Sequence, residues 1–224
     1  MKKDAEQVGI WGCKGSGKTT RQKEMIEGRK RVIVLDPMDN FGGKGYRRVT
    51  SIPAMRAAIQ AGWYNGFHLV IPTGHHEAQC LVFMRKLVPV LFLVQKPYYE
   101  GKRFMVGHEI TLVIDEAHKF FPNRTMTPEQ QEPLEDIIAL GRHYGIEMLA
   151  ASQRTANVWT DYRGNCDKQY FFAQGDHTDI ASALKSIGTE HRAALMDLRA
   201  HEYLLKSRSA GSKVVKGRNI AKFR

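Results

Sequence analysis

The sequence predicts an α/β fold in which helices flank a mostly parallel sheet. Short, nearly continuous apolar runs recur along the 224 residues, with helix-like stretches between them, and such runs are typical of strands covered on both faces. A glycine-rich run at residues 12–19 separates the first of these strands from the first helix. A later apolar strand ends at two adjacent acids, Asp115 and Glu116. Because ligands bind at the carboxyl ends of strands in such sheets, these features predict a binding site there.

The expected elements alternate along the chain. Apolar runs that end at turn residues predict strands at residues 8–11, 31–35, 67–71, 110–114, 146–151 and 169–173. Helical patterns are found at residues 19–27, 51–61, 77–94, 132–144, 176–186 and 190–198. We expect Pro89 to kink or break the third helix. Thr127-Pro128 and Glu132 are equally good starts for the fourth.

Residues 12–19 read GCKGSGKT and match the phosphate-binding pattern G-x-x-x-x-G-K-[ST] at every fixed position. Backbone N–H groups of such a loop, together with the helix dipole, bind phosphate. Lys18 would reach the β- and γ-phosphates of ATP, and the Thr19 hydroxyl would ligate Mg²⁺. A chance match in an ordinary glycine turn is disfavoured by the strand before it and the helix after it. The residues expected to contact the nucleotide are Gly12, Cys13, Lys14, Gly15, Ser16, Gly17, Lys18, Thr19 and Thr20.

The acid pair after the strand at residues 110–114 is the second chemical signal. Asp115 would hold Mg²⁺ directly or through water. Glu116 would polarise the attacking water as a general base. An exposed Asp-Glu turn is the alternative, but the phosphate loop upstream favours a hydrolytic site.

Three polar residues near the next strand complete the candidate site. Gln153 follows that strand and would lie beside the γ-phosphate, where its amide could sense hydrolysis, unless it only caps the strand. Arg142 could reach a neighbouring subunit's site as a catalytic arginine, or be a solvated charge. Arg154 competes with it for that role. We do not expect His118 to be a metal ligand, because no second His or Cys stands at matching spacing.

Composition narrows the function classes. No run reaches the ~18 apolar residues that span a bilayer, and the N-terminus lacks the apolar run of a signal peptide. Cys13, Cys80 and Cys166 are scattered without metal-ligand spacing, which indicates free thiols in a reducing, intracellular setting. No internal repeat or linker is visible, so we expect a single ATPase domain over residues 1–224.

The formal net charge of +11 exceeds what a nucleotide requires and favours a long polyanion, most simply nucleic acid. A basic surface that serves only solubility is the alternative. We expect a basic C-terminal segment at about residues 201–224, part of which could pair as a hairpin between residues 201–207 and 213–216. No acid follows Glu202, and the basic residues beyond it are Lys206, Arg208, Lys213, Lys216, Arg218, Lys222 and Arg224. Such tails often bind nucleic acid.

Four motifs of the sequence, taken together, resemble those of a known family. The phosphate loop, residues 114–118 (IDEAH), residues 141–146 (GRHYGI) and residues 152–154 (SQR) occur in the order seen in HerA/FtsK-type P-loop ATPases. The resemblance covers about residues 8–173 and implies a RecA-like (ASCE) P-loop NTPase core. The compact, basic chain most resembles the genome-packaging ATPases of membrane-containing icosahedral viruses.

This resemblance implies an ATP-driven homo-oligomeric ring, with a hexamer favoured, that moves double-stranded DNA into a capsid. It assigns Lys18 and Thr19 to phosphate and Mg²⁺, and Asp115 and Glu116 to Mg²⁺ and water. It assigns Gln153 to sensing and an arginine to action in trans. It also implies capsid or membrane-vertex partners, and a location in the host cytoplasm or at the packaging vertex of a virion. A HerA/Zot-like ATPase of phage assembly or DNA processing, or a small P-loop nucleotide kinase, is the alternative.

Overall fold

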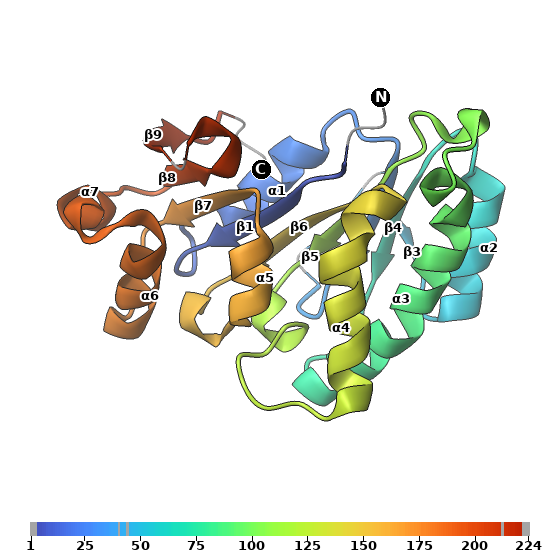
Figure 1. Cartoon of the computed structure of the whole chain (residues 1–224), viewed down its shortest axis with the longest axis horizontal. Helices are drawn as coiled ribbons and strands as arrows, with labels where there is room; N and C mark the ends of the chain where they lie inside the picture. Colours follow the sequence, from blue (N-terminus) through green and yellow to red (C-terminus); the bar gives the residue numbers. More distant parts are fainter. Residues whose placement is uncertain (1–3, 40, 44, 212, 221–224) are drawn as a thin grey trace. The chain divides into compact units, whose positions relative to one another are not determined.

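The computed structural model describes residues 4–39, 41–43, 45–211 and 213–220, and confirms the predicted α/β class. Within these residues, nine strands form one mostly parallel sheet in the order β3-β4-β2-β5-β6-β1-β7-β8-β9 (Figure 1). Lys222, Arg224 and the hairpin position Ser212 lie outside the described residues. No helix in the described ranges combines the length and hydropathy needed to cross a membrane.

The chain divides into two compact units. The first comprises Gly28–Asp115 and Thr125–Met148 with the N-terminal residues up to Glu6. The second comprises Gln7–Glu27, Glu116–Arg124 and Leu149–Arg224. The expectation of a single domain stays a prediction.

The first unit contains the parallel strands β2 (Arg31–Leu35), β3 (Arg47–Arg48), β4 (Phe67–Ile71) and β5 (Ile110–Ile114). Its helices are α2 (Ile52–Gly62), α3 (Glu77–Tyr99) and α4 (Pro128–Leu140), and α3 and α4 pack together. Strand β6 (Ile146–Ser152) begins here and ends in the second unit. Every residue of β2 and β5 is buried, as expected for strands covered on both faces.

The structure decides between alternatives that the sequence left open in two of these helices. Pro89 does not end α3, which continues through Pro89 and Pro97 to Tyr99. Proline removes one backbone donor, and the exposed Pro89 is tolerated in a helix whose buried face continues past it. Helix α4 starts at Pro128, where Thr127 and Gln130 form a capping box, and not near Glu132. It ends at Leu140, and the predicted helical residues after it form the 3₁₀ turn η3 (Gly141–Tyr144).

The second unit contains the buried strand β1 (Gln7–Trp11), which pairs in parallel with β7 (Lys168–Phe172). Antiparallel β8 (Glu202–Ser207) and β9 (Val214–Arg218) extend the sheet from β7, which confirms the predicted hairpin. The helices are α1 (Lys18–Ile26), α5 (Thr160–Asn165), α6 (His177–Ile187) and α7 (Arg192–Met196). Phe121 stacks on Tyr162 in the core, with ring centroids 4.6 Å apart.

Candidate nucleotide site

The phosphate loop leaves the sheet between the ends of two strands. The backbone N–H of Gly12 donates to the Ser152 carbonyl at the end of β6, at 3.2 Å, and the N–H of Cys13 donates to the Ala173 carbonyl after β7, at 2.8 Å. Gly17 precedes α1 with φ +111°, a backbone conformation that residues other than glycine rarely adopt. The loop therefore lies at the carboxyl ends of parallel strands, as the sequence predicted.

Two groups of the loop fit a bound phosphate. Lys18 is 8% exposed, and its Nζ donates to the carbonyl oxygen of Cys13 at 2.8 Å. The Ser16 hydroxyl is buried without a hydrogen-bond partner. Since a buried polar group without a partner costs free energy, an anion in the loop would satisfy this donor. Thr19 and Thr20 follow in the first turn of α1, where the helix dipole favours negative charge.

Glu116 lies in an unusual backbone conformation at the start of the turn η2 (Ala117–Lys119). Its φ is +54°, in the left-handed region, and it is 6% exposed. Such strain in a residue other than glycine costs about 1–3 kcal/mol and is concentrated at active sites. Glu116 thus combines a strained backbone with a buried side chain, and its role as the general base stays a prediction.

The structure brings Glu116 and Gln153 together, although 37 positions separate them. The Gln153 amide Nε2 donates to Glu116 Oε1. The other carboxylate oxygen, Oε2, is buried without a hydrogen-bond partner, and His118 Nδ1 lies 3.4 Å from it. That nitrogen is also 3.1 Å from the Ser152 hydroxyl. His118 thus contacts the candidate base, a role that we did not predict.

Asp115 belongs to the first unit. It is 4% exposed, and its N–H donates to the Leu35 carbonyl at 3.0 Å. No group of three or more His, Cys, Asp or Glu side chains in the described ranges could hold a metal ion. The Thr19 hydroxyl and the Asp115 carboxylate stay predicted donors. These hard oxygens suit Mg²⁺, which usually keeps water and phosphate oxygens as its other ligands.

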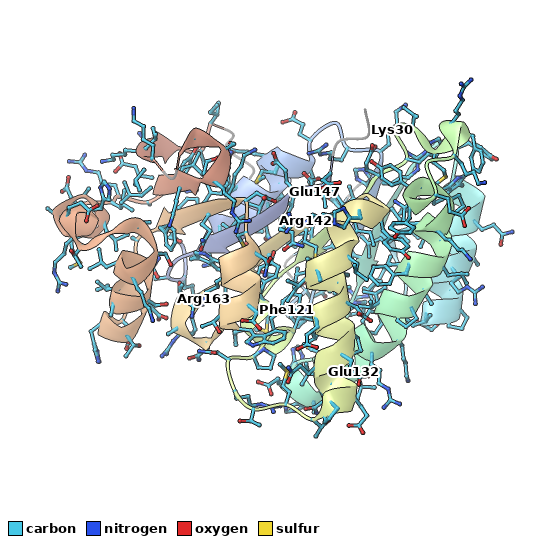
Figure 2. All side chains as sticks on the ribbon, viewed as in Figure 1. Lys30, Phe121, Glu132, Arg142, Glu147 and Arg163 are labelled. Atoms are coloured by element: carbon cyan, nitrogen blue, oxygen red, sulfur yellow. The ribbon has the colours of Figure 1, made fainter. Side chains whose placement is uncertain are left out.

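The two candidate arginines differ in their surroundings. Arg154 follows Gln153, and its Nε lies 3.2 Å from Oδ2 of Asp179, whose side chain is 2% exposed. Arg142 lies in η3, after the end of α4 (Figure 2). Its Nε is buried without a hydrogen-bond partner. Because Arg154 is already paired with a buried carboxylate, Arg142 remains our preferred candidate for the arginine that acts in trans.

Sequence reasoning missed two residues that contact the phosphate loop from the C-terminal hairpin. The His201 N–H donates to the Ser16 carbonyl at 2.8 Å, and the Asn219 Nδ2 donates to the Gly17 carbonyl at 2.8 Å. His201 and Asn219 also pair through their backbones. A Cβ on Gly17 would lie 2.8 Å from both side chains, so these residues pack against the loop. The register of the predicted hairpin was the signal that could have placed them side by side.

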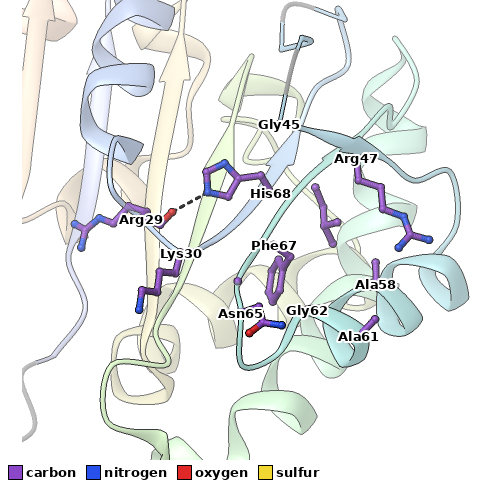
Figure 3. A pocket seen from close by; sticks show the side chains of 12 residues that line it. Arg29, Lys30, Gly45, Arg47, Ala58, Ala61, Gly62, Asn65, Phe67 and His68 are labelled. Carbon is purple, nitrogen blue, oxygen red and sulfur yellow. Dashed lines mark hydrogen bonds between the residues drawn. The ribbon is translucent and has the colours of Figure 1, made fainter.

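One pocket of the first unit contains none of the predicted site residues. It measures about 760 Å³ and lies in the first unit, where β2 and β4 begin, with Lys30, Arg47, Phe67 and His68 among its lining (Figure 3). Arg29 borders it but pairs with Glu147 at 2.7 Å. Much of the remaining lining is glycine, alanine and leucine. The phosphate loop binds phosphate through backbone N–H donors, so this site does not require a deep pocket.

Comparison with solved structures covers nearly the whole chain. The genome packaging NTPase B204 from Sulfolobus turreted icosahedral virus 2, in complex with ATP-gammaS, is 18% identical with a TM-score of 0.69, over 97% of this chain and 98% of that one. B204, the DNA-packaging ATPase from Sulfolobus Turreted Icosahedral Virus, is 20% identical with a TM-score of 0.68, over 99% and 100%. The chain has the fold of a viral genome-packaging NTPase. VirB4 of Thermoanaerobacter pseudethanolicus shares this fold at 12% identity and a TM-score of 0.66, over 96% and 89%.

The sequence was also compared with protein-family models and with curated protein sequences. A model of the family described as Zonular occludens toxin (Zot) matches residues 95–201. No curated protein sequence matches the chain. The matches to B204 and VirB4 confirm the predicted α/β NTPase fold, and at the level of the fold they confirm the resemblance to genome-packaging ATPases.

Proposed function

We propose that this protein is an ATPase that translocates double-stranded DNA, of the viral genome-packaging type. The observation that carries the proposal is the pairing of the left-handed Glu116 with Gln153, in the unit that contains the phosphate loop. A buried carboxylate held by an amide is suited to activate water for attack on a phosphate. The fold shared with B204 along almost the whole chain supports the packaging assignment.

The reaction follows from the groups in the site. Backbone N–H groups of the phosphate loop and Lys18 bind the triphosphate. Mg²⁺, held by Thr19 and Asp115, would neutralise phosphate charge when bound. Glu116 accepts a proton from the attacking water, and Gln153 orients that water through the contact it already makes with Glu116. An arginine from a neighbouring subunit, for which we propose Arg142, stabilises the charge that develops on the phosphate.

The partner that we propose is duplex DNA, held within a homo-oligomeric ring. The net charge of +11 supports a polyanionic partner, and contacts to the DNA backbone would be weakly sequence-specific and strongly salt-dependent. The ring favoured by the family resemblance is a hexamer. It would act in the host cytoplasm or at a packaging vertex, docked on capsid or membrane proteins.

The test is ATP turnover with and without double-stranded DNA, over a series of salt concentrations. We expect DNA to stimulate turnover in the wild type, and the stimulation to decline as salt rises because DNA contacts release counterions. Lys18→Ala should lower kcat/KM by about 10² in both conditions. If DNA did not change the rate of ATP turnover at any salt concentration, the proposal of a DNA-translocating ATPase would be contradicted.

The match to the Zot family favours a second candidate, an ATPase of phage assembly that does not transport DNA. It predicts DNA-independent turnover and co-purification with membrane or capsid-vertex proteins. The DNA-stimulation assay therefore separates the two candidates. A screen for phosphoryl transfer to nucleotides would test the kinase alternative, which the water-activating Glu116 disfavours.

A further inference from the structure

The second unit contains a polar pocket of about 320 Å³, away from the phosphate loop. We call it the basic pocket. It lies among α5, the start of β7, the end of α6 and the end of β8. Arg163 on α5 is labelled in Figure 2. The charged residues that line the pocket are Arg163, Asp167, Lys185, Lys206 and Arg208.

Four cationic side chains therefore border this pocket together with one carboxylate. The carboxylate already accepts a hydrogen bond: the backbone N–H of Gln7 donates to Asp167 Oδ2 at 2.9 Å. This excess of positive charge creates a local potential that attracts anions.

Backbone carbonyls hold two of the cations in place. Lys206 Nζ donates to the Ser186 carbonyl at 2.5 Å, and the Arg208 guanidinium donates to the Gly164 carbonyl at 2.5 Å. Neither carbonyl carries a full negative charge, and both cations keep further N–H donors. Lys185 is exposed at the end of α6. The pocket thus has more cations than carboxylates, and Lys206 and Arg208 are held in place by backbone carbonyls.

The basic pocket and the phosphate loop lie at opposite ends of the same strands. Asp167 directly precedes β7, whereas Ala173, just after β7, bonds to Cys13 of the loop. Since β7 has five residues, at ~3.3 Å per residue these ends are about 17 Å apart. Strand β8 likewise begins directly after His201, which bonds to Ser16, and ends just after Lys206 at the basic pocket. A nucleotide in the loop therefore leaves this pocket free for another anion.

We propose that the basic pocket binds a backbone phosphate of duplex DNA. The inference rests on the proposed function, and it names a surface of contact with DNA. Lysine and arginine donors that converge on one phosphate, without a base-reading group, give sequence-independent binding. The larger pocket in Figure 3 is less suited, because Arg29 is paired with Glu147 and small or apolar residues form much of the lining.

The test is the affinity of the full chain for a short duplex of mixed sequence, measured by fluorescence anisotropy at several salt concentrations. Lys185→Glu is the main variant, because Lys185 is exposed on the last turn of α6 and should tolerate substitution. Lys86→Glu, at an exposed position on α3, makes the same change in net charge and is the control. We expect Lys185→Glu to weaken binding roughly tenfold and to lower the salt slope by about 0.9, the value for one phosphate contact. The control should change the affinity less than about twofold by the same long-range charge effect.

The outcomes separate this inference from the proposed function. If the wild type does not bind the duplex, both fail. If the wild type binds and the two variants behave alike, the basic pocket is not a DNA site although the proposed function stands. ATP turnover without DNA should be unchanged in Lys185→Glu, and Lys185→Gln, which removes the charge without reversing it, should show a smaller loss of the same sign. A Lys185→Gln affinity equal to that of the wild type would also overturn the inference.

Discussion

The phosphate loop and the basic pocket, at the two ends of β7 and β8, present different groups. The loop offers backbone N–H groups and one buried lysine, in the same unit as the buried carboxylate of Glu116. The basic pocket offers half-buried or exposed cations and one engaged carboxylate. A reacting phosphate requires fixed geometry and a proton acceptor. A phosphate that is only bound needs positive charge nearby and no proton acceptor.

This difference predicts that substitutions at the loop change the chemical step or nucleotide binding, whereas substitutions at the basic pocket change only DNA affinity.

Replacing Glu116 should have the largest effect. Glu116→Gln keeps the size and the contact with Gln153 but removes the proton acceptor, so we expect kcat to fall by about 10³, within the range for general bases. Steady-state ATP turnover measures this. Glu132→Gln, at an exposed position on α4, is the matched control and should keep wild-type turnover. A Glu116→Gln enzyme with near-normal kcat would remove Glu116 from the mechanism.

Lys18→Ala should act mainly on the triphosphate. It removes the ammonium group that contacts the loop carbonyl of Cys13 and would contact phosphate, and we expect kcat/KM to fall by about 10². Lys86→Ala, on the exposed face of α3, controls for the lost charge. Equal kcat/KM in the two variants would mean that the loop does not bind the phosphates.

Asn219→Ala tests the contact between the hairpin and the loop. Losing one hydrogen bond to the Gly17 carbonyl should cost about 1 kcal/mol. We expect this as a roughly fivefold rise in KM for ATP with little change in kcat, because Asn219 positions the loop without touching the reacting atoms. Asn165→Ala on α5 loses a similar bond to a backbone carbonyl, that of Asp161, and should leave KM unchanged. If Asn219→Ala lowered the melting temperature without raising the KM for ATP, Asn219 would stabilise the fold and would not position the loop.

The smallest effect concerns the thiols. Cys13 in the loop is half-buried, whereas Cys80 and Cys166 are buried, and burial raises the pKa of the Cys166 thiol. Because thiolates react and buried thiols do not, native labelling followed by mass spectrometry should modify Cys13 first. ATP should slow that reaction. Labelling of Cys166 before Cys13 would contradict the burial of Cys166 in the core.

The sequence was most informative where local patterns determine structure. The strands predicted at residues 31–35, 67–71 and 110–114 have the observed bounds, because buried parallel strands are continuous apolar runs that end at turn residues. Helix α5, six residues with a glycine inside, has no apolar period and was missed. Strand β3 has two residues, too few for any pattern.

The same limit applies to the site. The phosphate loop and the acid pair are contiguous motifs, and they could be found without a structure. The contact of Asn219 with Gly17 joins residues 202 positions apart, and only the pairing of β8 with β9 and of β8 with β7 produces it. The left-handed conformation of Glu116 is equally invisible in sequence, because it is set by the turn between β5 and η2.

The most direct test of the central claim is an equilibrium titration of the Glu116→Gln variant with ATP and Mg²⁺ by calorimetry, followed by analysis of the bound nucleotide. We expect one ATP bound per chain and recovered intact, because the phosphate loop is complete and the proton acceptor is gone. The absence of binding heat in a folded sample, or recovery of ADP at the rate of the wild type, would contradict it.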